Sequence, residues 1–215
     1  AAPDAFQVVN TTGNPVATVT TFSNRALYEE DAFNWTASGR ELYEGYDYLN
    51  GNKRAYPFSL QGITGNQAYC TVEFAARHTS ATTVNIDING SSVGTFTLFG
   101  VSGSDSYTKA QVTNYTASNW KSNYSDQTTV TLTHSRPSGA NGRLNYIALN
   151  YRSTLKMYGS STVFRDLSTV GKGVVRYNLS DCNSNTVVWD VTTPGEYAQV
   201  QGSLSGSVYS FLGNN

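Results

Sequence analysis

The feature that most constrains this fold is a strict alternation of apolar and polar side chains. In residues 84–88 every second residue is Val or Ile, and the two residues between them are Asn and Asp. Such alternation gives a strand with one buried face and one solvated face. Asn89 and Gly90 follow directly, and the strand pattern resumes at residues 93–99. Because a type I′ turn needs positive φ at both central residues, this arrangement predicts a β-hairpin.

The same alternation recurs along the chain. Residues 144–152 place Ile147, Leu149 and Tyr151 on one face of a strand, and residues 129–134 alternate Thr with larger side chains. Turn-forming residues separate these runs. A series of short strands with turns between them predicts an all-β fold, in which an antiparallel β-sandwich or jelly roll is followed by a small additional β unit.

Composition supports this class and excludes several functions. Charged residues make up 13% of the chain, whereas 39% of the residues are hydrophobic and 15 are tyrosines. Aromatic residues suit half-buried sheets, and this apolar content argues against intrinsic disorder. The net charge of −1 and the lack of a basic cluster argue against nucleic acid as a partner. Without a run of about 18 apolar residues, no membrane-spanning segment is expected.

The pattern divides the chain into three regions. We expect an N-terminal extension with short strands at residues 1–24, a jelly-roll-like β-sandwich at residues 25–155, and a small β-rich unit at residues 156–215 that leads toward a further domain. The chain begins Ala-Ala-Pro without Met, which favours a processed or trimmed N-terminus. A secreted parent protein whose signal has been removed would fit this beginning.

Residues that could support catalysis or bind a metal are sparse. The only Cys and His residues are Cys70, Cys182, His78 and His134. A cysteine nucleophile needs an imidazole to activate it, but Cys70 lies on the apolar parity of a strand, and Cys182 lies in a polar loop that should be exposed. His134 ends a strand on its buried parity and should be hydrogen-bonded at the rim. Two imidazoles cannot complete a zinc site, so we expect a non-catalytic chain without cofactor.

A stretch rich in tyrosine and carboxylates at residues 28–48 is the candidate contact surface. Aromatic residues and arginine are enriched at protein interfaces. Trp120 lies in a polar run and should be exposed, whereas Trp189 shares strand parity with Val187 and Val191 and is expected in the core. The candidate binding residues are Tyr28, Arg40, Glu41, Tyr43, Tyr46, Tyr48 and Trp120.

Four segments occur in a recognisable order: residues 38–41 (Ser-Gly-Arg-Glu), 144–152, 163–165 and 187–192. Together they resemble the N-terminal β region of PorU-like proteins, the sortases of the type IX secretion system in Bacteroidetes, which belong to the gingipain-like (C25) cysteine peptidases. The resemblance covers about residues 25–201. The family has Trp-Tyr-Gly-Glu after the first segment, where this chain has Leu-Tyr-Glu-Gly, a departure that fits a divergent paralogue.

This resemblance implies a secreted or cell-surface parent, associated with the outer membrane or located in the periplasm. A downstream peptidase domain would carry the catalytic His–Cys pair, and none of the family's catalytic residues falls in this chain. In that family the sortase removes the C-terminal signal domain from secreted cargo and helps to attach the cargo to anionic lipopolysaccharide. The implied role here is support, docking or cargo positioning. The implied partners are the downstream domain, secreted cargo and other secretion-system components.

Two other functional classes stay open at this point. A carbohydrate-binding module predicts an exposed aromatic platform and a glycan partner. A purely structural cell-surface domain predicts neither glycan binding nor a downstream catalytic domain. Oxygen-rich loops at residues 102–106 and 181–185 also leave a calcium site open. The sequence does not decide whether Cys70 and Cys182 form a disulfide.

Overall fold

The computed structural model describes residues 7–37, 39–105, 108–118 and 124–214. These residues form two compact units. The large unit runs from Arg25 to Arg152. The small unit combines the described residues up to Asn24 with those from Ser153 onward.

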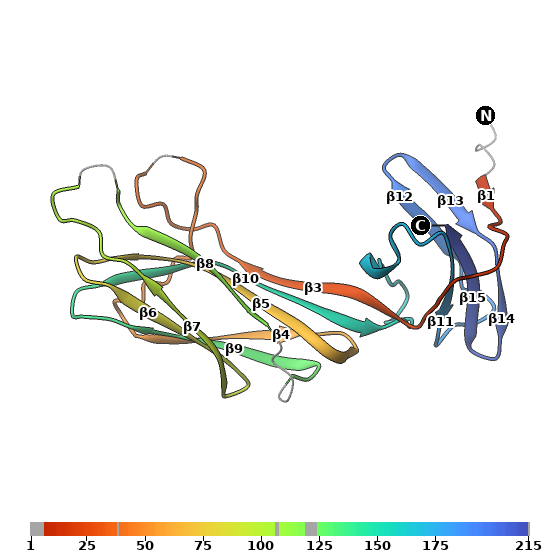
Figure 1. Ribbon diagram of the computed structural model, residues 1–215, viewed down its shortest axis with the longest axis horizontal. Helices are drawn as coiled ribbons and strands as arrows, with labels where there is room; N and C mark the ends of the chain where they lie inside the picture. Colours follow the sequence, from red (N-terminus) through yellow and green to blue (C-terminus); the bar gives the residue numbers. More distant parts are fainter. Residues whose placement is uncertain (1–6, 38, 106–107, 119–123, 215) are drawn as a thin grey trace. The chain divides into compact units, whose positions relative to one another are not determined.

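The chain passes between the units inside two strands. One crossing lies in β3 (Thr21–Glu29) and the other in β10 (Asn141–Thr154) (Figure 1). Both strands therefore contribute their longer part to the large unit.

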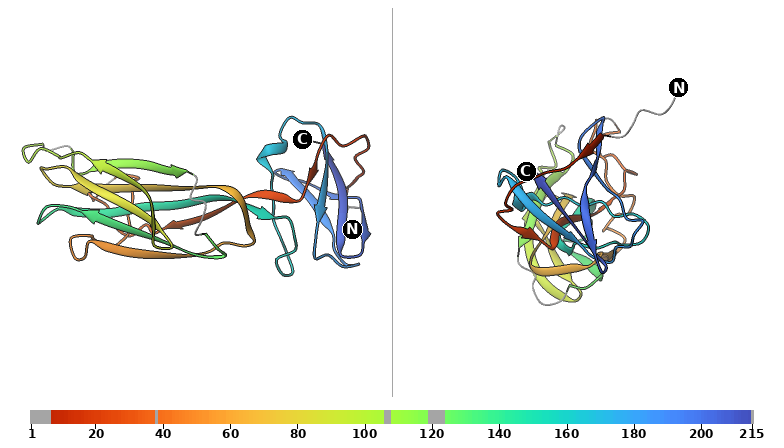
Figure 2. Two further views of the ribbon diagram at one scale, coloured as in Figure 1. Left: turned by 60° about the horizontal axis from the view of Figure 1, so that its bottom comes forward. Right: turned by 90° about the vertical axis from the view of Figure 1, so that its right-hand side faces the viewer.

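The large unit is a β-sandwich of two four-stranded sheets, with strand orders β3-β10-β5-β8 and β4-β9-β6-β7. Figure 2 shows the two sheets as separate layers. The pairs β5–β8, β4–β9, β6–β7 and β6–β9 are antiparallel. The expected all-β sandwich is therefore confirmed. The further strands are β4 (Lys53–Ser59), β5 (Ile63–Arg77), β6 (Thr82–Ile88), β7 (Ser91–Leu98), β8 (Gln111–Ser118) and β9 (Gln127–Ser135).

The β6–β7 hairpin has the turn that its sequence predicts. Asn89 and Gly90 have φ values of 47° and 86°, the positive values of a type I′ turn. Ile88 pairs with Ser91 across this turn. The hairpin prediction is therefore confirmed, down to the two residues that form the turn.

The core of the large unit lies between the sheets. Strands from both sheets contribute apolar side chains that alternate with polar ones, and burying each such side chain stabilises the fold by about 1.5–3 kcal/mol. The fully buried residues include Val72, Phe74, Ile86, Leu132, Ile147 and Leu149.

The small unit contains two further sheets, with strand orders β14-β15-β11-β2 and β1-β13-β12. The N-terminal strands β1 (Gln7–Val9) and β2 (Thr18–Val19) pair in parallel with β13 and β11. The remaining elements are η1 (Leu167–Thr169), β11 (Val174–Leu179), β12 (Val188–Thr193), β13 (Glu196–Val200), β14 (Gly202–Ser205) and β15 (Val208–Asn214).

The compact units differ from the sequence-based division at two places: residues 153–155, assigned there to the sandwich, belong to the small unit, and so does the N-terminal segment. That division sets residues 1–24 apart as an extension, whereas the described part of this segment belongs to the small unit. The reason is long-range pairing. The backbone groups of β1 and β2 find their partners in β13 and β11, about 160–190 residues later in the chain.

Trp189 corrects a prediction about the small core. Trp189, Val187 and Val191 share one parity as expected, but they are 37%, 49% and 55% exposed. Val188 between them is buried, and it pairs with the buried Val200. Alternation fixes which residues share a face of a strand, but packing against the neighbouring sheet decides which face is buried.

Cys182 is also placed differently from the sequence-based prediction. It is buried rather than exposed, and its thiol donates to the carbonyl oxygen of Leu179 at 3.3 Å. Its short side chain packs with the small unit's core, and its amide donates to the Ser207 carbonyl at 2.9 Å, which holds the loop after β11 beside the turn that precedes β15. Cys70 is buried in β5 as predicted, and both thiols are free.

His134 is the third difference. Its side chain is fully buried, and its ring lies 6.2 Å from the ring of Tyr48 and 5.2 Å from that of Phe74, measured between centroids. Among the described residues neither ring nitrogen has a hydrogen-bond partner, so the predicted rim hydrogen bond is absent. The physical reason is that Tyr48, from the loop after β3, covers the end of β9. Burial, with the Arg136 charge adding to it and Asp47 opposing it, lowers the pKa of His134 to about 4.

This burial predicts a specific loss of stability in acid. The pKa of His134 is lower in the folded chain than in the unfolded chain. The stability that the buried neutral imidazole contributes is therefore fully present above about pH 6.5 and is lost as the pH falls toward 4. A shift of this size costs about 3 kcal/mol at pH 4. At pH 7 we expect the free energy of unfolding of His134→Leu to lie within about 1 kcal/mol of the wild-type value, because no hydrogen bond is lost. Urea unfolding at pH 7, 6, 5 and 4 would measure the difference, and parallel pH profiles for the two proteins would contradict the prediction.

Candidate functional site

The predicted contact surface lies mainly in the β3–β4 loop, residues 30–52. Connections of this length without regular structure are uncommon and are often functional. The loop folds back on itself through a bridge between Phe33 and Tyr43. The amide nitrogens of Ala32 and Phe33 donate to the Tyr43 carbonyl at 3.0 and 2.8 Å, and the Tyr43 amide donates to the Phe33 carbonyl at 2.8 Å.

The returning half of the loop is anchored along β10. The amide of Glu44 donates to the Leu144 carbonyl, and the amide of Tyr48 donates to the Gly142 carbonyl, each at 2.8 Å. The Asp47 carboxylate accepts from the side-chain amide of Asn141 at 2.8 Å and from the Gly142 amide at 3.2 Å. The loop therefore gains backbone partners much as an additional strand would.

Two arginines hold the same half of the loop. Arg143 donates to the carbonyl oxygens of Glu44 and Gly45 at 3.1 and 2.7 Å and forms an ion pair of 3.2 Å with Asp47. Its guanidinium also lies 3.6 Å from the centre of the Phe33 ring. Arg136 donates to the carbonyl oxygens of Tyr48 and Leu49, each at 3.0 Å. Two side chains can hold this half of the loop because each guanidinium group donates hydrogen bonds to several backbone carbonyls at once.

A buried carboxylate, Glu44, lies at the centre of this region. The Tyr56 hydroxyl donates to Glu44 Oε1 at 2.7 Å, and Arg54 Nη1 lies 3.0 Å from Glu44 Oε2. The Tyr28 hydroxyl is at the outer limit of hydrogen bonding, 3.5 Å from Oε2, and Tyr48 and Tyr56 share a hydroxyl hydrogen bond of 2.8 Å. Tyr28 belongs to one sheet and Tyr56 to the other, so this carboxylate contacts residues of both sheets.

Burial decides the electrostatics of this cluster. Desolvation raises the pKa of Glu44, opposed by the hydrogen bond from Tyr56 and the charge of Arg54. Desolvation likewise raises the pKa of Tyr48 and of Tyr56, with the neighbouring carboxylate adding to it. The tyrosines therefore stay protonated and act as donors. Arg54 lies at the edge of the cluster, where its guanidinium carbon stacks over the Tyr46 ring, 4.7 Å from the ring centre.

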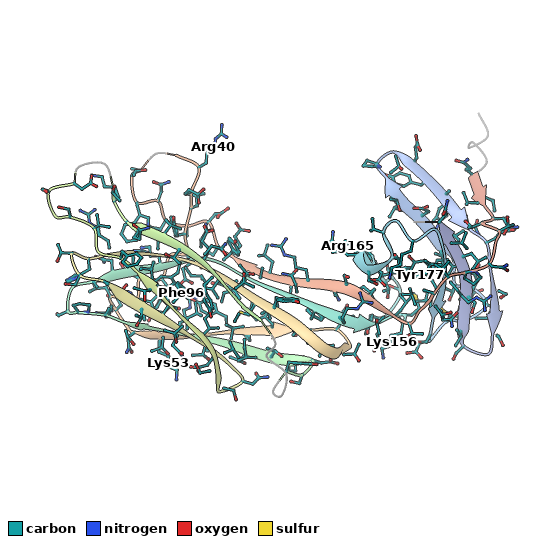
Figure 3. All side chains as sticks on the ribbon, viewed as in Figure 1. Arg40, Lys53, Phe96, Lys156, Arg165 and Tyr177 are labelled. Carbon is teal, nitrogen blue, oxygen red and sulfur yellow. The ribbon has the colours of Figure 1, made fainter. Side chains whose placement is uncertain are left out.

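The structure separates the predicted contact residues into three groups. Tyr43 and Tyr48 are buried and cannot belong to an exposed surface, because their rings fill the space beneath the loop. Tyr28 and Tyr46 are half-buried, and the Tyr46 hydroxyl donates to the Gly51 carbonyl at 3.0 Å. Arg40 and Glu41 are exposed at the tip of the loop, where Arg40 projects outward (Figure 3). Trp120 lies outside the described residues.

A second carboxylate near the loop was missed in the sequence. Glu73 on β5 accepts from the side-chain amide of Asn145 at 2.6 Å, and the same amide reaches Glu41 at 3.4 Å. Burial, with these two carboxylates adding to it, raises the pKa of Tyr43 to about 12. The available signal in the sequence was that Glu73 is the one carboxylate in β5. The exposed part of the candidate surface is therefore acidic at Glu41 and basic at Arg40, with the half-buried Glu73 beside it.

The cysteines and histidines do not assemble into a reactive site. Burial raises the pKa of the Cys70 thiol to about 12, which disfavours the thiolate. Cys182 belongs to the other unit, and His78 accepts a hydrogen bond from the Ser80 amide at 2.9 Å. Within the described ranges, no three Cys, His, Asp or Glu side chains gather as a metal site would require.

The part of the chain that the structure describes contains no helix that is long and apolar enough to span a bilayer.

Comparison with known proteins gives a strong structural similarity. No family model matches the chain, and no curated protein matches it in sequence. The chain is similar to a crystal structure of dimeric latent PorU from Porphyromonas gingivalis, with a TM-score of 0.87, 19% identity, and coverage of 99% of this chain and 21% of that chain. The chain thus spans about a fifth of that protein's length. The PorU-like β fold expected from the sequence is confirmed at the level of fold.

Two carbohydrate-binding modules are similar over part of the chain. A CBM36 module in complex with calcium and xylotriose has a TM-score of 0.37 and 16% identity, covering 59% of this chain and 98% of that one. A family 35 module from Clostridium thermocellum has a TM-score of 0.34 and 16% identity, covering 60% of this chain and 90% of that one. These TM-scores are too low to support an inference about this chain.

The buried cluster predicts a large effect of a single truncation. Glu44→Ala removes the acceptor of the buried Tyr56 hydroxyl and the ion-pair partner of Arg54, whose side chain is 32% exposed. We expect it to lower the free energy of unfolding by about 3 kcal/mol, measured by urea titration at pH 7. The control is Glu29→Ala, an exposed carboxylate on β3, which should change stability by no more than about 0.5 kcal/mol. Equal effects of the two substitutions would show that the cluster does not stabilise the fold.

Proposed function

We propose that this chain is a non-catalytic β module of a PorU-like, gingipain-like cysteine peptidase, and that it supports and docks a downstream peptidase domain. The observation that carries the proposal is the fold likeness to PorU, with a TM-score of 0.87 over 99% of the chain. That coverage includes residues of both units. Four sequence segments in the order typical of this family support the same assignment from independent information.

A binding role rather than a catalytic one is supported by the chemistry of the candidate groups. The Cys70 thiol is buried with a raised pKa, and the His134 imidazole is buried with a pKa lowered to about 4. A thiolate nucleophile needs the opposite environment, with a nearby positive charge or imidazole and access for a substrate. In this proposal the catalytic His–Cys pair belongs to a further domain of the parent protein.

We further propose that the tip of the β3–β4 loop forms the contact with that domain or with secreted cargo. Its exposed side chains are Arg40 and Glu41, and Tyr46 and Tyr28 flank them half-buried. The same loop is fixed from beneath by Arg143, Asp47 and the buried Glu44. A contact surface built on an anchored loop loses little conformational entropy on binding. The parent is proposed to lie at the bacterial cell surface or in the periplasm.

The first test is the size of the native gene product. Antiserum against this chain should detect a protein about five times longer than the 215 residues, because this chain covers 21% of the similar structure. We expect this band in the outer-membrane or secreted fraction of the source cells. A band at 23.3 kDa in pulse-labelled cells, without a larger precursor, would refute the proposal.

The second test concerns the loop tip in the full-length product. The double variant Arg40→Ala, Glu41→Ala should lower processing of secreted cargo several-fold, because interface residues of this kind contribute to docking. Its melting temperature should stay unchanged, because both side chains are exposed. The matched control is Arg77→Ala, Glu29→Ala, which also removes one exposed Arg and one exposed Glu from the large unit. Equal processing by the two double variants would exclude the loop tip as the contact surface.

A further inference from the structure

The small unit contains an open groove that has no role in the function proposed above. Its volume is about 790 Å³. The floor is the outward face of β14, β15 and β11, and the wall is the end of β1 together with the connection from β13 to β14. Tyr209, Phe211 and Leu212 line part of the groove, and its polar lining residues are Asn10, Thr11, Arg176, Gln199, Gln201, Ser203 and Ser210.

Strand pairing explains why the floor is polar. Ser203 lies directly opposite Ser210, and Arg176 lies opposite Leu212 in the next pair of strands. The residues that alternate with them, Tyr177 and Phe211, are buried in the core of the small unit. The sheet therefore has one apolar side, and its other side presents hydroxyl and guanidinium groups to the groove.

The wall is fixed by backbone hydrogen bonding. The amide of Gln201 donates to the carbonyl oxygen of Val9 at 3.0 Å, which holds the chain after β1 beside the start of β14. Gln199 pairs with Val8 on the outward side of β13. This arrangement brings the side chains of Asn10, Gln199 and Gln201 to one side of the groove.

The groove offers many hydrogen bonds and one positive charge. Within the described part of the chain, the side chains of Arg176, Gln199 and Gln201 have no protein hydrogen-bond partner, so they are available to a ligand. Arg176 is the one charged residue among the described residues that line the groove. A guanidinium without a neighbouring carboxylate favours a ligand that carries a carboxylate.

We infer that this groove binds an oligosaccharide that carries a carboxylate, with Arg176 contacting the acid group and Gln199, Gln201 and Ser203 contacting hydroxyl groups. Side-chain amides and hydroxyls can each donate and accept, which matches the alternating donors and acceptors of a sugar. Tyr209, Phe211 and Leu212 also line the groove, but most of its lining surface is polar, whereas a peptide or a lipid would need apolar pockets. The open, shallow form suits an extended chain of sugars.

The test is titration of the 215-residue chain with oligouronates. Isothermal calorimetry and amide chemical shifts would be measured with oligogalacturonate, oligoglucuronate and oligomannuronate, and with methyl-esterified oligogalacturonate as the neutral counterpart. We expect at least one acid form to bind with a Kd of about 1 mM or tighter. The esterified form should bind about tenfold more weakly, because it lacks the charge that pairs with Arg176.

Variants locate the binding to the groove. Arg176→Gln should weaken binding about tenfold, and Gln201→Ala should weaken it less. The matched control is Arg165→Gln, which removes an exposed arginine of the same unit that does not line the groove (Figure 3). No binding of any of the three acids, or equal losses in Arg176→Gln and Arg165→Gln, would overturn the inference. The result of this binding test does not depend on whether the parent protein is PorU-like, because that proposal is tested separately by the size of the native product.

Discussion

The large unit depends on the burial of one carboxylate. Glu44 comes from a loop, but its partners lie on strands of both sheets: Tyr28 on β3, and Arg54 and Tyr56 on β4. A charge moved out of water must be compensated by hydrogen bonds and an opposite charge. The loop can therefore adopt only a path that brings Glu44 to these partners. That path also sets Tyr48 over the end of β9 and presents Arg40 at the surface.

Glu44 and His134 show two different solutions to the burial of an ionisable group. Glu44 is surrounded by donors and an arginine, whereas His134 lies between the rings of Tyr48 and Phe74 without a hydrogen bond among the described residues. Gly142 contributes to this packing, because a Cβ at that position would lie 2.6 Å from His134 Nδ1. The imidazole is therefore held as a neutral ring that fills space. The two groups lie beneath the same loop, so the loop's position determines both environments.

Sequence reasoning succeeded where a local rule was sufficient. The Asn89-Gly90 turn follows from the φ angles that a type I′ turn requires, and the buried faces of β6 and β10 follow from their alternation. It failed where the deciding contact lies far away in the chain. Tyr43 and Tyr48 look like surface residues in a polar, charged segment, but both are buried, and the loop that carries them is anchored at Glu44 and Tyr48 to backbone carbonyls about 100 residues later. Trp189 faces solvent because Val188 packs toward Val200, a choice that alternation alone leaves open.

The sequence by itself determined the fold class, the hairpin turn and the sets of residues that share a strand face, because these depend on backbone geometry over a few neighbouring residues. The tertiary structure decided which face of β12 is buried, that β1 and β2 join the far end of the chain, and that the tyrosine-rich loop is mostly anchored rather than exposed. It also created the groove at Arg176, whose lining comes from residues near positions 10, 176, 200 and 210. The physical reason is that burial and hydrogen-bond satisfaction are properties of groups brought together by folding, and no local pattern encodes the partner.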